Sequence, residues 1–361
     1  MKNYTFKTAL FLFLIPLVSF GNNDIKKQEK TRVIKKEFSV NSNATVDLNN
    51  RYGNLIITTW NKNRVEIEIR ITVKGNDLEQ VEDKLSQIDV VFSSTASLVK
   101  AKTVFEKTKH SWNWFRKGSN TNFTINYFVK MPASNNVDLH NDYGNIYLDK
   151  LEGKAFVNCD YGKISIGELL NTTNKINLEY CSSSTISYLK KGDVNIDYSK
   201  LTIERADQIR LNADYSNLNF YDVKNLDFNT DYGSIRVDKG RNVSGNSDYS
   251  SLKLGTITKN LEINADYGSI RVKNLAKGFE MVDIVAEYTG IRIEVEPGNN
   301  FDFVIDLQYA SFKRDRENVE IFKSIEKSSR KHYEGVYGKQ KSTSKVIIKS
   351  QYGGVSIKEK F

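Results

Sequence analysis

The chain contains only two cysteines, three prolines and three histidines. Cys159 and Cys181 are too few for a disulfide framework, and they occupy different points of successive sequence repeats, so we do not expect a bond between them. The histidines His110, His140 and His332 show no metal-ligand spacing and have no partner serine or cysteine. We therefore expect no cofactor, no metal and no catalytic residue.

Long apolar runs are also scarce, and the chain has one near its start, from Ala9 to Phe20. Lys2 and Lys7 precede this run and Gly21 follows it, a pattern typical of a cleaved secretory signal peptide at residues 1–21. A membrane anchor is the alternative, but the run is shorter than the roughly 20 residues that span a bilayer. The sequence thus predicts an exported protein with no transmembrane segment in the mature chain.

The composition lacks an acidic excess and long helix-forming stretches. The net charge is +9, and removal of Lys2 and Lys7 with the signal leaves +7, a mild bias toward anionic partners. Asn, Ser, Thr, Tyr, Ile and Val are abundant. Because β-branched and aromatic residues favour strands, this composition predicts an all-β protein.

An internal repeat of 17–21 residues is the strongest feature of the sequence, and each unit carries one tyrosine. An acidic residue usually precedes this tyrosine, and a small residue follows it. The repeat tyrosines are Tyr143, Tyr161, Tyr180, Tyr198, Tyr215, Tyr232, Tyr249, Tyr267, Tyr288, Tyr309 and, after a step of 43 residues, Tyr352. The run Arg51-Tyr52-Gly53-Asn54-Leu55 is a further repeat element.

Each unit has apolar or small residues six, four and two places before the tyrosine, and aliphatic residues three and five places after it. Alternation at period two indicates two short strands with one buried face each, joined at a tight corner beside the tyrosine. A unit this small must stack on its neighbours to bury a core. We predict a β-solenoid of about 17–21-residue coils, similar to a single-stranded β-helix. An outer-membrane barrel is the rival, but its strands need about ten alternating residues.

The region before the repeats has longer alternating segments and one capped amphipathic segment, Gly75 to Ile88. We expect a linker at residues 22–37, an N-terminal β-rich cap domain with one short helix at 38–131, and solenoid repeats at 132–361. A polar, basic insertion interrupts the repeats at about 313–345.

Three segments carry a family resemblance: Arg51 to Trp60, the helix entry Val73-Lys-Gly75, and Val129-Lys-Met-Pro132 before the repeats. Together with the Tyr-Gly units they resemble the putative adhesin family of Bacteroidota, a domain of unknown function related to the head domains of autotransporter adhesins. The resemblance covers nearly the whole mature chain. It implies a β-helical protein of a Gram-negative cell envelope, with adhesion suggested by name and no assigned active site.

A basic column is the first candidate binding site. Four places after the tyrosine, five coils in succession along the chain carry an outward-facing cation: Arg236, Lys253, Arg271, Arg292 and Lys313. A row of cations at the coil spacing suits an anionic polymer. The alternative is a solvated face paired with nearby carboxylates.

The tyrosines and the acidic residues before them form two further columns. The tyrosines share parity with buried aliphatic residues, so we expect an internal aromatic stack; the alternative is a carbohydrate-stacking platform. The acidic residues are expected to cap the corner as Asx-turns, with calcium binding as the alternative.

The loop from Lys107 to Lys117 places Trp112, Trp114 and Phe115 among cations between two strands. Exposed aromatics in a basic loop indicate contact with a partner or a membrane interface. The alternative is a hairpin tip folded onto the cap domain.

These features predict a non-enzymatic, adhesin-like envelope protein that binds or scaffolds through its repetitive surface. The expected partner is an anionic glycan, another envelope polymer or a protein, and not nucleic acid, which an exported protein seldom meets. A periplasmic structural or sensing protein without a glycan ligand is the alternative. A β-helix enzyme acting on polysaccharides is a third reading, because paired carboxylates can serve as acid and base. The expected location is the periplasm, or the cell surface or outer membrane, of a Gram-negative bacterium.

Overall fold

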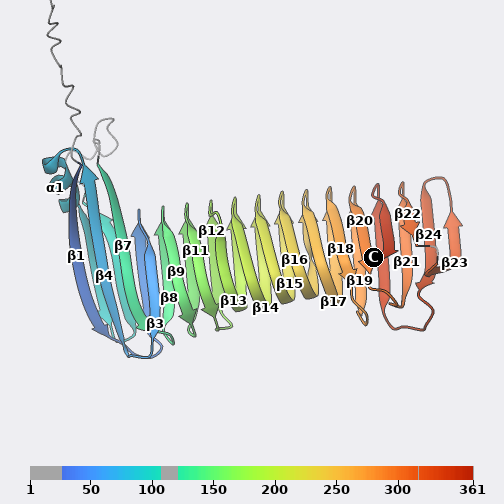
Figure 1. Ribbon diagram of the computed structural model, residues 1–361, viewed down its shortest axis with the longest axis horizontal. Helices are drawn as coiled ribbons and strands as arrows, with labels where there is room; N and C mark the ends of the chain where they lie inside the picture. The colour runs from blue at the N-terminus through green and yellow to red at the C-terminus, as the bar shows by residue number, and fades with distance from the viewer. Residues whose placement is uncertain (1–26, 107–120, 316, 361) are drawn as a thin grey trace, which may run out of the picture.

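The computed structural model describes residues 27–106, 121–315 and 317–360, and these form a straight rod of stacked β-strands with a single helix beside one end (Figure 1). The predicted signal peptide lies outside the described residues. The prediction of an all-β solenoid is confirmed, because parallel strands pair coil upon coil along most of the rod.

Within the described ranges, no helix has the length and apolar character needed to cross a membrane.

The middle of the rod consists of similar coils, some of which form one continuous strand and others two short strands. The strands are β8 (Asn136–Asp142), β9 (Asn145–Leu151), β10 (Ala155–Asp160), β11 (Lys163–Leu169), β12 (Asn174–Glu179), β13 (Ser184–Asp197), β14 (Lys200–Asp214), β15 (Asn217–Asp231), β16 (Ser234–Asp248), β17 (Ser251–Asp266), β18 (Ser269–Leu275), β19 (Met281–Glu287) and β20 (Gly290–Val295). Each coil pairs in register with the next, so equivalent residues of successive coils form columns along the rod.

The core follows the sequence pattern. In the coil of β14, Ile209, Leu211 and Ala213 point inward before the corner, and Leu218 and Phe220 point inward after it; all five are buried. In several coils an apolar residue eight places after the tyrosine fills the opposite corner, as Val223, Ile257 and Leu275 do. Stacking therefore buries the apolar face that a single coil would expose.

One end of the rod is built from parallel and antiparallel strands, with the helix beside them. The elements are β1 (Gln28–Ser39), β2 (Thr45–Arg51), β3 (Leu55–Trp60), β4 (Arg64–Gly75), α1 (Leu78–Ser86), β5 (Ile88–Thr95), β6 (Leu98–Phe105) and β7 (Asn122–Pro132). The helix begins where the sequence predicts, with the Asp77 carboxylate accepting from the Gln80 N–H at 2.9 Å. Residues 28–37, expected as linker, belong instead to β1, which pairs with β4 over its whole length.

The first coil of the stack comes from this same region. β2 lies parallel to β8, and β3 lies parallel to β9, so the coil around Tyr52 continues the solenoid. The division into domains at residue 132 stays a prediction. The strand pairing shows that β6 and β7 extend the stack beyond this coil, because they lie parallel to β2 and β3. The strands β4, β1 and β5 then pair antiparallel at the end of the rod.

The other end departs from chain order. Its strands are β21 (Phe301–Gln308), β22 (Phe312–Arg314), β23 (Val319–Glu326), β24 (Arg330–Tyr337), β25 (Lys345–Gln351) and β26 (Val355–Glu359). β25 pairs in parallel with both β19 and β21, so the coil around Tyr352 lies between those of Tyr288 and Tyr309. The basic insertion predicted at 313–345 contains an antiparallel hairpin, β23 and β24, that covers this end of the rod.

Candidate binding surfaces

The tyrosine of each coil lies at the corner in a left-handed backbone conformation. Its φ is positive throughout the series, as at Tyr215 (49°) and Tyr267 (52°), which is uncommon for residues other than glycine. The N–H of Tyr215 donates to the carbonyl oxygen of Asp231 in the next coil at 2.9 Å. The corner thus keeps the hydrogen-bond ladder unbroken while it turns the tyrosine side chain outward.

The expected internal stack of tyrosines is wrong. Each repeat tyrosine is exposed, for example by 50% at Tyr215 and 51% at Tyr249. The alternation of inward and outward side chains along a strand would place the tyrosines inside only if the backbone stayed extended through the corner. The left-handed residue reverses that parity, and the residue after the tyrosine points inward instead: Ser216 is fully buried.

The exposed tyrosines stack face to face into one ladder along the rod. From the coil of Tyr143 to that of Tyr288, centroids of adjacent rings are 4.8–5.0 Å apart, and ring planes are 2–9° apart. The ladder extends to Tyr52 at one end, and through Tyr352 to Tyr309 at the other. Because neighbouring rings cover each other's faces, the inner rungs present edges and hydroxyl groups to solvent. A sugar stacks on a ring face, so the ladder does not form a carbohydrate-stacking platform along its length.

A buried hydroxyl supports the corner. Ser216 Oγ donates to the carbonyl oxygen of Asp214 at 2.7 Å and accepts from the Ser199 N–H of the adjacent coil at 3.0 Å. Ser199, Ser250 and Thr289 make the equivalent pair of bonds. The predicted Asx-turn is therefore wrong in these coils: the residue after the tyrosine caps the corner, and the acidic side chain before it stays outside.

Those acidic side chains form a second ladder next to the tyrosines. Nine carboxylates lie in register on adjacent strands: Asp142, Asp160, Glu179, Asp197, Asp214, Asp231, Asp248, Asp266 and Glu287. Only Asp142 forms an ion pair within the described ranges, to Arg51 at 2.7 Å. Burial first, and then the neighbouring carboxylates, raise the pKa values of Asp214 and Asp248. We call this series the acidic ladder.

The acidic ladder does not form a metal site of the usual kind. Among the residues that the structure describes, no three His, Cys, Asp or Glu side chains gather in a way that would hold a metal ion. Carboxylates at the interstrand spacing lie in a line, whereas Ca²⁺ needs six to eight oxygen ligands around one centre.

An asparagine ladder, which the sequence reasoning missed, runs beside the acidic ladder. Each amide nitrogen donates to the amide oxygen of the preceding coil, as from Asn195 to Asn177 and from Asn212 to Asn195, both at 2.9 Å. The series continues through Asn229, Asn246 and Asn264. An asparagine three places before the tyrosine is visible in the sequence of every coil from Tyr161 to Tyr267, and amide ladders are typical of stacked in-register strands.

The predicted basic column lies outside the core, and all five of its side chains are exposed. Arg236, Lys253, Arg271 and Arg292 occupy register partners on four adjacent coils. The fifth residue, Lys313, is not adjacent to Arg292, because Ser356 of the inserted strand β26 lies between them. The column is thus four cations in a row, then one serine, then one cation.

Two members of the column are paired with carboxylates. Arg236 Nε lies 2.8 Å from Asp238, and Arg271 lies 3.0 Å from Glu294. Lys253, Arg292 and Lys313 form no ion pair with any described residue. Exposed ion pairs are weak, so all five cations are accessible to a ligand.

A shallow groove of about 420 Å³ runs beside the column. The residue two places after each tyrosine is small in these coils and lines the groove: Ser251, Ser269, Gly290, Gly354 and Ser311. Lys253, Arg271, Arg292 and Lys313 line it too. Because a row of small residues lies next to a row of long cationic ones, the strand surface is hollowed along the rod axis. We call this the basic groove.

The same positions differ in the earlier coils. The column four places after the tyrosine holds Tyr147, Ser165 and Thr202, and Lys163 and Lys200 occupy the position of the small residues. A small residue two places after the tyrosine and a cation four places after it therefore occur together only among the coils from Tyr232 onward.

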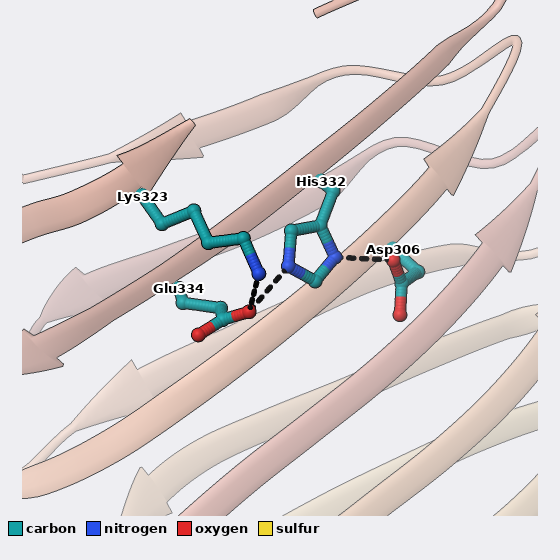
Figure 2. A network of polar contacts seen from close by, with 4 residues as sticks. All are labelled: Asp306, Lys323, His332 and Glu334. Atoms are coloured by element: carbon teal, nitrogen blue, oxygen red, sulfur yellow. Dashed lines mark hydrogen bonds and ion pairs between the residues drawn. The ribbon is translucent and has the colours of Figure 1, made fainter. Parts of the chain in front are cut away.

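A polar network joins the hairpin to the last coils of the rod (Figure 2). His332 bridges two carboxylates, with Nδ1 2.6 Å from Asp306 and Nε2 2.7 Å from Glu334, and Lys323 lies 2.6 Å from Glu334. The hydrogen bond with Asp306, followed by that with Glu334, raises the pKa of His332. The imidazole thus links β21 to β24.

The remaining candidates add no site. Trp112, Trp114 and Phe115 lie outside the described residues, as does His110, so their roles stay predictions. His140 bonds to Asp138 and Asn158 on the coil surface.

Both cysteines are buried and free. The hydrogen bond with Cys181 and then burial raise the pKa of Cys159, which keeps it a protonated thiol.

Comparison with known proteins gives names but no activity. No family model matches the chain, and no curated protein matches it. Solved structures similar to it include a putative lipid binding protein and a putative adhesin, both from Parabacteroides distasonis, with 13% and 11% identity and TM-scores of 0.27 and 0.26. They cover 91% of this chain and 96% and 97% of their own. A putative adhesin from Bacteroides fragilis has 11% identity and a TM-score of 0.23, covering 91% of this chain and 97% of its own.

These names agree with the resemblance seen in the sequence: putative adhesins of Bacteroidota are among the solved structures similar to this chain. None of the three is named as an enzyme. At such TM-scores the likeness carries no argument about what this chain binds.

Proposed function

We propose that the protein is a non-enzymatic, adhesin-like component of the cell envelope that binds a linear anionic polymer in the basic groove. The observation that carries the proposal is the register of four exposed cations, Arg236 to Arg292, of which the last three line the groove beside a row of serine and glycine residues. Export to the envelope follows from the predicted signal peptide at residues 1–21.

The groove suits a polymer better than a small ligand. It is open and shallow, and it repeats the same contact at each coil, about 4.8 Å along the rod. A compact ligand would meet one or two cations, whereas a chain lying along the groove meets four or five. Guanidinium groups bind carboxylates and phosphates through paired hydrogen bonds, so an acidic glycan or another anionic envelope polymer is the expected ligand.

The strength of binding comes from several weak contacts. An exposed ion pair contributes about 0.2–1 kcal/mol, so four give roughly 1–4 kcal/mol. This corresponds to an affinity change of about fivefold to several hundredfold. Such binding weakens with added salt, because exposed charges are screened over about 10 Å at 0.1 M salt.

Binding of the mature protein to polygalacturonate and to lipopolysaccharide tests the proposal, with dextran as the neutral control. The variant R236Q/K253Q/R271Q/R292Q removes the column. A matched variant, K163Q/K175Q/K191Q/K200Q, removes the same charge from the earlier coils. We expect salt-sensitive binding to the native protein and to the matched variant, and a loss of about tenfold or more for the column variant.

Equal binding by both variants would show that net charge attracts the polymer without a site. No binding to any anionic polymer would favour a periplasmic structural or sensing protein whose repeats provide a stable surface. Turnover of a polysaccharide would overturn the non-enzymatic reading.

A further inference from the structure

The tyrosine ladder and the acidic ladder together form a surface that the proposed function does not use. The tyrosines from Tyr143 to Tyr288 are each exposed by 44–52%, so the surface is a continuous line of half-exposed rings. Contiguous exposed aromatic surface marks an interaction site, and tyrosine is enriched at protein interfaces. The ring faces are covered, so a partner meets ring edges, hydroxyl groups and the adjacent carboxylates.

The charges of this surface specify a cationic partner. From Asp160 to Glu287 the carboxylates form no ion pair with any residue in the described part of the chain. Like charges on adjacent strands repel each other, and cations placed along the ladder relieve this repulsion.

The spacing of the ladder also restricts which kind of partner can bind along it. Adjacent tyrosine rings from Tyr198 to Tyr267 are 4.8–4.9 Å apart, which is the coil repeat. An extended peptide places its side chains on one face about 6.6–6.8 Å apart, so its charges fall out of step with the ladder after a few rungs. A partner made of stacked strands stays in step over any length.

The same chain presents such a partner surface. Arg236, Lys253, Arg271 and Arg292 repeat at the same coil spacing, because they too occupy one register column. Within one molecule the two surfaces are not paired: the basic column lies five residues along the chain from the acidic ladder, on the other side of the corner, and no ion pair joins them in the described residues.

We propose that the tyrosine and acidic ladders of one molecule bind the basic column of a second copy, side by side along the rods. Carboxylates and tyrosine hydroxyls of one rod then accept hydrogen bonds from guanidinium and ammonium groups of the other. This inference uses the basic column of the proposed function but does not depend on polymer binding. A polyanion in the basic groove competes with the second copy, so polymer binding would separate the rods.

Sedimentation velocity of the mature protein, at rising concentration and at low and high salt, measures this association. We expect reversible self-association at low salt that disappears at high salt. Two variants that each lose one surface dissect it. D197N/D214N/D231N/D248N removes four carboxylates with little change in shape, and R236Q/K253Q/R271Q/R292Q removes four cations.

Each variant alone is expected to self-associate roughly tenfold more weakly or not at all. Their mixture is expected to associate again, because one variant keeps the cations and the other keeps the carboxylates. Thermal unfolding of both variants checks that the fold persists. A native protein that stays monomeric at all salt concentrations would overturn the inference. A mixture of the two variants that does not associate would overturn it as well.

Capture of oligolysine by a native protein that remains monomeric would also overturn it, because the ladder would then serve a basic peptide. The failures of the two proposals are distinguishable. The Asp→Asn variant keeps its basic groove, so it still binds polygalacturonate if the proposed function holds, whether or not it self-associates.

Discussion

The coils around Tyr161 to Tyr215 and those around Tyr232 to Tyr288 have the same inside and different outsides. In both halves aliphatic residues fill the core, a tyrosine turns the corner, and a carboxylate precedes it. Four places after the tyrosine, the earlier coils carry Ser165 and Thr202, while the later coils carry Arg236 and Lys253.

This difference shows which positions the fold constrains. Most inward positions are apolar and matched in size, because the interior is close-packed. The outward positions four places after the tyrosine make at most exposed ion pairs, so their side chains are free to serve binding. The tyrosines are an exception, since they are exposed and yet recur in every coil.

Removal of a core side chain gives the largest expected effect, and the effect is the same in both halves. Ile203 and Leu254 occupy the same inward column, and each is buried. We expect Ile203→Ala and Leu254→Ala each to lower the free energy of unfolding by about 2–5 kcal/mol. Urea denaturation followed by circular dichroism measures this. A loss confined to one half would contradict the equivalence of the coils.

Loss of one rung of the tyrosine ladder comes next. Tyr215→Ala and Tyr249→Ala each remove two stacked contacts, which we expect to lower the free energy of unfolding by about 1–2 kcal/mol. The same denaturation experiment applies, with Tyr221→Ala as a control because Tyr221 is exposed outside the ladder. If a ladder substitution lowered the free energy of unfolding no more than Tyr221→Ala does, stacking would add nothing to stability.

The His332 network distinguishes the end of the later half. The pKa of His332 is raised from the ordinary 6.5. The stabilising contact of its imidazole with Asp306 and Glu334 is therefore fully present below pH 6.5 and is lost as pH rises through the raised value. We expect weaker protection of the β24 amides above the raised pKa than below it, with protection taken relative to the intrinsic exchange rate at each pH, corresponding to about 0.5–1 kcal/mol. His332→Gln should make this protection independent of pH over the same range. Unchanged protection in the native protein would refute the linkage.

The acidic ladder is expected to have a smaller effect of opposite sign. Because the pKa of Asp214 is raised above 3.8, its repulsion is present at neutral pH and is relieved as pH falls through the raised value. Asp214→Asn should therefore raise the melting temperature slightly at pH 7 and not at pH 4. Asp248→Asn should do the same in the later half. A lower melting temperature at pH 7 would mean that the carboxylate has a favourable partner.

The smallest effect on stability is expected for the residues that make the two halves differ. Lys253→Gln should change the free energy of unfolding by less than about 0.5 kcal/mol, because Lys253 is exposed and contributes no ion pair within the described residues. Denaturation paired with the polymer-binding assay separates binding from folding. A large loss of stability would show that the basic column supports the fold.

Repetition made the fold predictable, because one pattern repeated many times outweighs the ambiguity of a single short strand. Residues such as Leu211 and Ile263 were assigned to the core from period two alone, and both are buried. The pattern failed at the tyrosine. A single left-handed residue reverses the parity, and the acid-Tyr-Gly or acid-Tyr-Ser signal does not state the sign of φ.

The candidate surfaces were predicted less completely. The four adjacent cations could be predicted by aligning the coils on their tyrosines, since each cation lies four places after a tyrosine although the coils differ in length. The position of Lys313 could not be predicted, because no local feature of the sequence shows that β26 inserts between two earlier coils.

The sequence by itself determined the solenoid, its coil length and the columns of core, acidic and basic residues, because these depend on local alternation and on spacing. Only the tertiary structure decided that the tyrosines form an exposed ladder, that a buried hydroxyl caps the corner, and that the coil around Tyr352 lies out of chain order. Each of these depends on contacts between coils. The choice among such contacts is made by packing and hydrogen bonding across the stack, not within one repeat.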